Sequence, residues 1–179
     1  GLVSKGLLPP LTERMEWIAA DGERVPSPPD GYVVSFLPFH ARGFGAPAHS
    51  FLRGLLHYYG LELQHLTPTG IQHIAAFVAL CEGFLGIRPH FGLWKFFFKV
   101  GMNSTSRAGP VGCAVIQLRS GLNYMRIKAT GSNKGWHGLW FYLRNDAAGV
   151  LPPFTGAYYV SAPKVWVKRV SSNERKHLD

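Results

Sequence analysis

The spacing of the apolar residues changes near residue 110, and this change limits the folds that the chain can adopt. Between residues 51 and 100 most apolar side chains recur every three or four positions, which is the repeat of an α-helix. From residue 112 onward the apolar residues fall in short strand-like runs, and within 124–129 apolar and polar side chains alternate, which is the repeat of a β-strand. Helices followed by short strands predict an α+β fold. We expect an N-terminal helical half, with three main helices, packed against a small C-terminal antiparallel sheet.

Three segments carry the helical repeat. The first spans 51–59 and ends where Gly60 can cap it. The second begins after Thr67, a suitable N-cap, and runs to Gly86. Its apolar residues cover nearly the whole circumference, which predicts a central, buried helix. The third, 91–100, is so rich in aromatic residues that it suits a buried helix or a strand, and we favour a helix.

Strands are expected at 32–37, 112–119, 124–129 and 136–144. One or two further edge strands are expected within 158–167. The segment 7–20 has the pattern of a short helix, and residues 102–109 have the composition of a polar loop.

Length and proline positions predict a single compact unit. The chain has 179 residues, which is within the usual size of one domain. Residues 1–31 are expected to form an approach segment with a Pro-rich linker, 32–170 the compact α+β domain, and 171–179 a polar tail. No run of 18 apolar residues is present, so no membrane span is expected. Without a secretory leader, and with two cysteines, the chain is expected to be intracellular, either cytoplasmic or nuclear.

Basic residues outnumber acidic ones. The chain has 19 Lys and Arg against 10 Asp and Glu, a formal net charge of +9. Such a surface attracts polyanions. Rings interspersed with bases on the expected sheet would form a platform for single-stranded nucleic acid. In the other interpretation, the aromatic rings pack in the core and the basic side chains simply face water. The candidate nucleic-acid-binding residues are Arg119, Arg126, Lys128, Lys134, Trp136 and Arg144.

The sequence offers little for enzymatic chemistry. Two-metal chemistry needs several converging carboxylates, but Glu82 is the only acid within 63–145. We expect Glu82, in a helix that looks buried, to pair with a base or to lie at a helix edge. Cys81 and Cys113 lack the spacing of a zinc site, and no phosphate-binding loop is present. We therefore expect no catalytic residues, no metal, no cofactor and no small-molecule substrate.

Several motifs resemble a domain that is common in plant genomes and is labelled "putative gypsy-type transposon". That domain lies in the amino-terminal, gag-side part of gypsy-type long-terminal-repeat retrotransposon polyproteins. The most specific motif is 77–87, and the segments 11–14 and 132–142 resemble the lead-in and a downstream motif. The other matching motifs are Gly43-Phe44-Gly45-Ala46-Pro47, Phe51-Leu52-Arg53-Gly54-Leu55-Leu56 and Leu66-Thr67-Pro68.

The resemblance implies a modest role. The family is often named a transposase, yet this sequence has no acidic triad, reverse-transcriptase motif, protease motif or zinc knuckle. The resemblance therefore suggests a non-enzymatic, gag-like structural or interaction domain, self-associating or adopted by a host, whose partner is itself or another protein. A basic module that binds RNA or single-stranded DNA is the alternative, and an enzyme of unknown type is the third hypothesis. Gly43, Gly45, Gly83 and Gly86 are expected to serve close backbone approach and capping.

Overall fold

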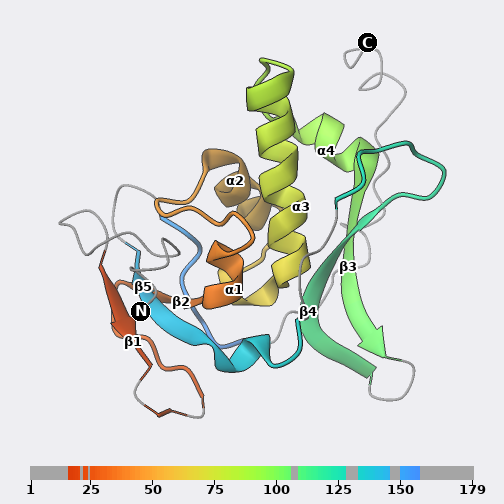
Figure 1. Cartoon of the computed structure of the whole chain (residues 1–179). Helices are drawn as coiled ribbons and strands as arrows, with labels where there is room; N and C mark the ends of the chain where they lie inside the picture. Colours follow the sequence, from red (N-terminus) through yellow and green to blue (C-terminus); the bar gives the residue numbers. More distant parts are fainter. Residues whose placement is uncertain are drawn as a thin grey trace.

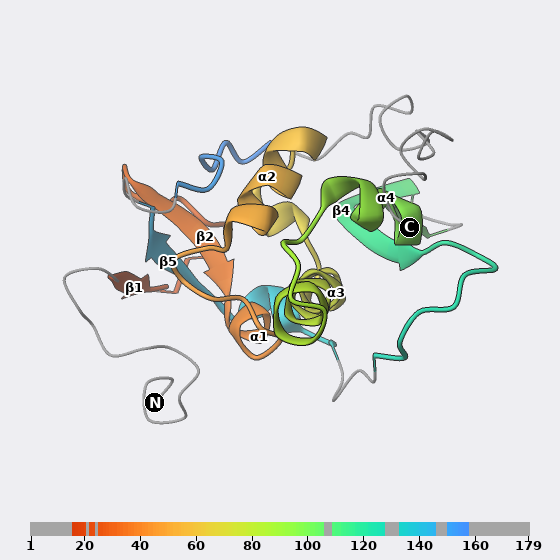
Figure 2. The ribbon, with the colours of Figure 1, turned by 90° about the horizontal axis from the view of Figure 1, so that it is seen from above.

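The computed structural model describes residues 16–20, 22–23, 25–105, 109–127, 133–145 and 150–157, without the side chains of 103–105 and 109–112. These residues form an α+β fold, as the sequence predicts. The helices lie between two small antiparallel sheets, which Figures 1 and 2 show from the side and from above. The single C-terminal sheet that we expected is therefore replaced, among the described residues, by two sheets on opposite sides of the helices.

The first sheet joins the two ends of the described chain. Its order is β1 (Trp17–Ala19), β5 (Trp140–Arg144) and β2 (Tyr32–Phe36), all antiparallel. β2 confirms the strand expected there. The expected strand 136–144 is shorter, because its first residues form a 3₁₀ turn, Trp136–Gly138. Three successive residues of β5 are buried, so both faces of this central strand are covered: Phe141, Tyr142 and Leu143.

The helix expected within 7–20 is wrong where the structure describes it. Residues 17–19 are strand β1, which pairs with β5 more than 120 residues later. Aromatic and β-branched residues fit a pleated edge, and pairing with β5 overrides the helical pattern. The part of that segment before residue 16 lies outside the described residues. The sheet thus takes in residues that precede Tyr32, where we expected the compact body to begin.

The predicted helix ends are confirmed where a capping residue in the neighbouring sequence sets them. After the short α1 (Leu37–His40), α2 (Ser50–Tyr59) ends at Gly60, whose φ of 61° is left-handed. α3 (Pro68–Ala79) begins as expected, because the Thr67 hydroxyl accepts the N–H of Gly70 at 3.0 Å. α3 continues into a π-helical turn, Leu80–Phe84.

The second sheet is a hairpin that the sequence only partly predicts. α4 (Phe91–Phe97) leads directly into β3 (Phe98–Thr105), which pairs with β4 (Gly109–Leu118). Most of the expected polar loop 102–109 is therefore strand, and the third helix stops at residue 97. The expected strand 124–129 is wrong for residues 124–127, which have no regular structure. The rest of that segment, the strands expected within 158–167 and the tail 171–179 lie outside the described residues.

Aromatic rings hold the helices against the hairpin. Trp94 of α4 stacks on Phe98 with ring centroids 4.2 Å apart, and both rings are fully buried. Phe77 of α3 meets the Trp94 ring edge-on at 5.3 Å. Such pairs add to the area that the rings bury, and they explain the aromatic density of residues 91–98. This cluster makes the middle of α3 central, as expected.

A buried polar network fastens residues 155–157 to the helical half. The Glu62 carboxylate accepts the backbone N–H of Thr155 at 2.8 Å and also the Thr155 hydroxyl. Nδ1 of His65 accepts the N–H of Glu62 at 2.9 Å, so Nε2 carries the proton and donates to the carbonyl of Ala157. A buried carboxylate is tolerated here because these donors replace water.

Candidate interaction surface

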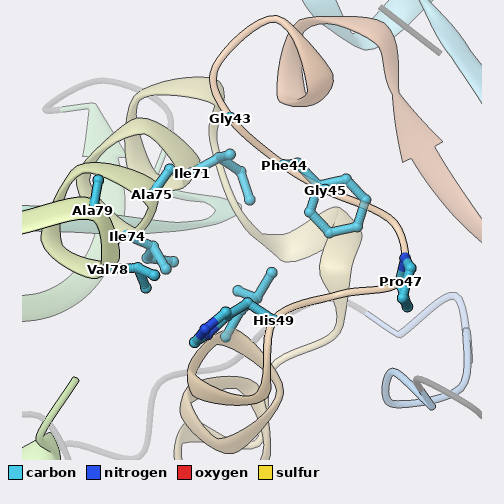
Figure 3. Close-up of a pocket in the computed structure, with 11 residues that line it drawn as sticks. Gly43, Phe44, Gly45, Pro47, His49, Ile71, Ile74, Ala75, Val78 and Ala79 are labelled. Atoms are coloured by element: carbon cyan, nitrogen blue, oxygen red, sulfur yellow. The ribbon is translucent and has the colours of Figure 1, made fainter. Parts of the chain in front are cut away.

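An apolar cleft lies between α3 and the loop that joins α1 to α2. Its volume is about 350 Å³, and its walls are residues 43–45, Pro47 and His49 of the loop, Leu52 of α2 and one side of α3. Figure 3 shows Phe44 and Pro47 on the loop facing Ile74 and Val78 on the helix. A hollow with apolar walls and few polar groups suits an apolar side chain better than a charged ligand.

Gly43 sets the width of this cleft. Its φ is +92°, and a Cβ at this position would lie 2.8 Å from the Cβ of Ala75 on α3. The loop can approach the helix only because Gly43 has no side chain, which confirms the expectation of close backbone approach there. Gly45 is different, because a Cβ there would meet nothing within 4 Å.

His49 connects α2 to the end of α3 at the mouth of the cleft. Its Nδ1 accepts the N–H of Phe51 at 3.1 Å and so caps α2. Its Nε2 therefore carries the proton and donates to the Glu82 carboxylate at 3.1 Å. The expectation that Glu82 pairs with a base is confirmed, but Glu82 is exposed rather than set in a buried helix.

Three large apolar side chains are exposed where α3 ends, and we call them the apolar tip: Phe84, Leu85 and Ile87, exposed by 84%, 55% and 44%. They correct the prediction that the helix is buried along its whole length. Figure 1 shows this end of α3 rising beyond the neighbouring elements. Cys81 is buried, whereas residues 82–88 are exposed. Gly86, at φ +65°, turns the chain here, as expected for a cap.

The tip and the cleft belong to one surface. Val78 and Ala79, in the last turn of α3, line the cleft, and the π-helical turn that follows carries Phe84. Apolar residues exposed together on a soluble domain are typical of interaction sites. The tip could not be recognised in the sequence, because the apolar pattern alone does not distinguish a covered helix end from an uncovered one. The glycines at 83 and 86 were the available signal that the regular helix stops before residue 87.

The structure distributes the six predicted nucleic-acid-binding residues over separate elements. Arg144 lies on β5 and is paired with Glu16 at 2.7 Å. Arg119 follows β4, in the other sheet, and its Nε donates to the carbonyl of Lys95 at 2.9 Å. Trp136 is only 7% exposed and packs edge-on against Phe36 at 4.7 Å. The ring is therefore part of the core, and no single sheet carries these residues together.

The other three predicted residues lie outside regular structure or outside the described residues. Arg126 is exposed in the segment after β4, and Lys134 is exposed in the turn before Trp136. Lys128 lies outside the described residues. The turn of Lys134 is held to α3 by its neighbour Asn133, which donates to the Thr69 hydroxyl at 2.9 Å.

Cysteines, metal-binding groups and membrane spans can be assessed for the described residues. Both cysteines are free thiols, Cys81 buried and Cys113 partly buried. No group of three or more His, Cys, Asp or Glu side chains comes together in the part of the chain that the structure describes. None of the helices within the described ranges is long and apolar enough to cross a membrane.

One comparison with known proteins gives a match. A family described as "Putative gypsy type transposon" matches residues 33–102. No curated protein and no solved structure matches the chain. The resemblance found in the sequence is confirmed over these residues, which run from β2 through all four α-helices into β3. The cleft and the apolar tip lie inside the matched segment, whereas the similar motifs at 11–14 and 132–142 lie outside it.

Proposed function

We propose that this gypsy-type transposon domain is a non-enzymatic, gag-like structural module, retrotransposon-derived, that self-associates by placing the apolar tip of one copy in the cleft of the next. The observation that carries the proposal is Phe84, a large apolar side chain that is 84% exposed on the same helix whose preceding turns line an apolar hollow. Two copies thus offer each other a protruding group and a recess.

The geometry of this contact favours an extended assembly. The tip and the cleft are different parts of this surface, so after one contact forms one copy still has a free cleft and the other still has a free tip. Such heterologous contacts give rings when the rotation closes and open filaments when it does not. Repeated identical contacts are what a particle-forming protein requires, which is why this contact supports a gag-like role.

The expected contact is weak for a single pair. Burying an apolar side chain of this size is worth about 1.5–3 kcal/mol, so the exposed parts of the three tip residues are worth about 3–5 kcal/mol. Association costs an estimated 4–15 kcal/mol before any contact is made. Contacts from the cleft walls must supply the rest, and we expect assembly only at high protein concentration. The net charge of +9 opposes association, so added salt strengthens it by screening.

Analytical ultracentrifugation of two complementary variants tests this arrangement. Phe84→Asp removes the tip, and Ala79→Glu places a charge at the mouth of the cleft. Val25→Asp is the matched control, because Val25 is 76% exposed and lies outside the surface. We expect each of the first two variants to be monomeric, the control to assemble as the wild type does, and a mixture of the two variants to form a one-to-one complex.

The mixture is informative because each variant keeps the half that the other lacks. A wild-type protein that stays monomeric at every concentration and salt would refute self-association. Assembly that survives Phe84→Asp would exclude the tip. Monomers in the mixture, with an assembling wild type, would exclude head-to-tail pairing.

A basic nucleic-acid-binding module is the second candidate function. It is favoured by the charge of the described body: between residues 31 and 145 the only described acids are Glu62, which is buried, and Glu82. Changing Arg126 and Lys128 to Glu is expected to abolish RNA binding and leave assembly intact. RNA affinity that falls steeply with salt in the wild type supports this function, and unaltered binding by the double variant would refute those two residues.

A further inference from the structure

A second cavity, on the other side of α3, is not part of the interaction surface. It has a volume of about 570 Å³ and is lined by His73 of α3, Leu118 of β4 and residues 124–127. This volume is within the roughly 300–1,000 Å³ of small-ligand sites. The segment 119–127 that leads to it leaves β4 as a long extended loop, shown in teal in Figure 2.

Two buried polar atoms on the cavity residues have no hydrogen-bond partner among the residues that the structure describes. They are Nδ1 of His73 and the hydroxyl of Tyr124. Both rings pack on Phe98, the His73 ring at 5.4 Å and the Tyr124 ring at 5.1 Å, so the two residues share one aromatic neighbour beside the cavity. A buried polar group without a partner costs free energy, and a ligand that supplies the missing bonds recovers it.

Burial keeps both groups neutral near pH 7. It lowers the pKa of His73 and raises the pKa of Tyr124 to about 12. A neutral imidazole nitrogen and a phenol can each donate or accept, depending on tautomer and rotamer. They fit the uncharged donors and acceptors at the edge of a heteroaromatic ring.

The walls and the rim of the cavity differ in character. Leu118, Met125 and Ile127 provide apolar surfaces, and Met125 is 43% exposed beside the opening. Arg126 also lines the cavity, and within the described ranges its guanidinium has no ion-pair or hydrogen-bond partner. An exposed guanidinium beside an apolar recess is suited to a phosphate attached to a group inside the recess.

We propose that this cavity binds one nucleotide unit, with the base among the apolar walls and against His73 and Tyr124, and with its phosphate on Arg126. The same chemistry is offered by a free mononucleotide and by an unstacked nucleotide of a single strand. The site does not depend on self-association. For a single strand it deepens the nucleic-acid function proposed second, because it places one base in a defined pocket rather than on a general basic surface.

Titration calorimetry of the full chain with adenosine and uridine 5′-monophosphates, and with short single-stranded oligo(A) and oligo(U), tests the site. Arg126→Gln is compared with Lys99→Gln, which removes an equal charge from an exposed position on β3 outside the cavity. Tyr124→Phe, which removes only the hydroxyl, is compared with Tyr58→Phe on α2. Thermal melts confirm that each variant is folded.

The expected results separate the two sources of the ligand. Arg126→Gln is expected to weaken binding by about tenfold or more and Tyr124→Phe by about two- to tenfold, while both controls change it less than twofold. Binding of mononucleotides and oligonucleotides in this pattern identifies a nucleotide site open to both, and binding of oligonucleotides alone identifies a single-strand site. The cavity site is overturned if neither class binds, or if Arg126→Gln and Lys99→Gln lose affinity equally. If Arg126→Gln and Lys99→Gln lose affinity for the oligonucleotides equally, the result supports binding to a general basic surface instead of the cavity.

Discussion

Replacing Gly43 with alanine is expected to destabilise the domain by about 2–5 kcal/mol. The backbone at φ +92° costs a residue with a Cβ roughly 1–2 kcal/mol. The added Cβ would also lie 2.8 Å from the Cβ of Ala75, and relieving such overpacking typically costs about 1–3 kcal/mol. Gly45→Ala, in the same loop, is the matched control and is expected to change the free energy of unfolding by less than about 0.5 kcal/mol.

Urea unfolding followed by tryptophan fluorescence measures the free energy of unfolding of both variants, which can be compared directly when their m-values are equal. For a chain of this length each kcal/mol corresponds to about 2–4 °C in Tm, so Gly43→Ala lowers the Tm by at least about 4 °C. Adding Ala75→Gly removes the overlapping Cβ and separates the steric part from the backbone part in a double-mutant cycle. Equal losses for the two glycine variants, or no coupling between positions 43 and 75, would refute the close-approach explanation.

Three further changes test the core and its polar groups. Burial lowers the pKa of His40 from 6.5 to about 4. The neutral side chain therefore contributes about 3 kcal/mol to the free energy of unfolding above pH 6.5, and this contribution is lost as the pH falls toward 4. The free energy of unfolding, measured with denaturant across this pH range, is expected to fall less in His40→Gln than in the wild type, and an equal fall would contradict this explanation. Thr155→Val removes a hydrogen-bond donor to the buried Glu62 carboxylate and is expected to lower the free energy of unfolding in urea by about 1.5–3 kcal/mol. An unchanged free energy of unfolding would show that residue 155 does not pack against Glu62. Trp136→Ala is expected to cost about 3–5 kcal/mol, whereas a stable variant that only loses RNA binding would show a surface ring.

The charge distribution links the two proposed functions through salt. Few acidic residues occur among the basic ones between residues 31 and 145, so copies of the chain repel each other and attract polyanions. Added salt therefore strengthens contacts through the apolar tip and weakens contacts with RNA. A single salt titration of assembly and of RNA affinity thus gives opposite slopes if both functions are present.

Helix ends were predictable from the sequence because their signals are local. Thr67 caps the first turn of α3 through its own side chain, and Gly60 supplies the left-handed residue that ends α2. Such signals need no distant partner, so the positions of these helices follow from a few neighbouring residues. Strand β2 was also predictable, because its apolar run is bounded by turn residues on its N-terminal side and by Pro38.

Strand partners and surface exposure were decided by the tertiary structure. The apolar and aromatic run in 136–144 indicates a strand, but only the assembled fold pairs β5 with β1 and β2 and separates Arg144 from Arg119. The candidate site shows the same limit. The sequence identifies 77–87 as a specific apolar motif, yet Phe77 is fully buried and Phe84 is 84% exposed. The periodicity of the sequence shows which side chains are apolar. The elements that pack against each turn of α3 determine which of these side chains are buried and which, beyond Cys81, stay exposed for a partner.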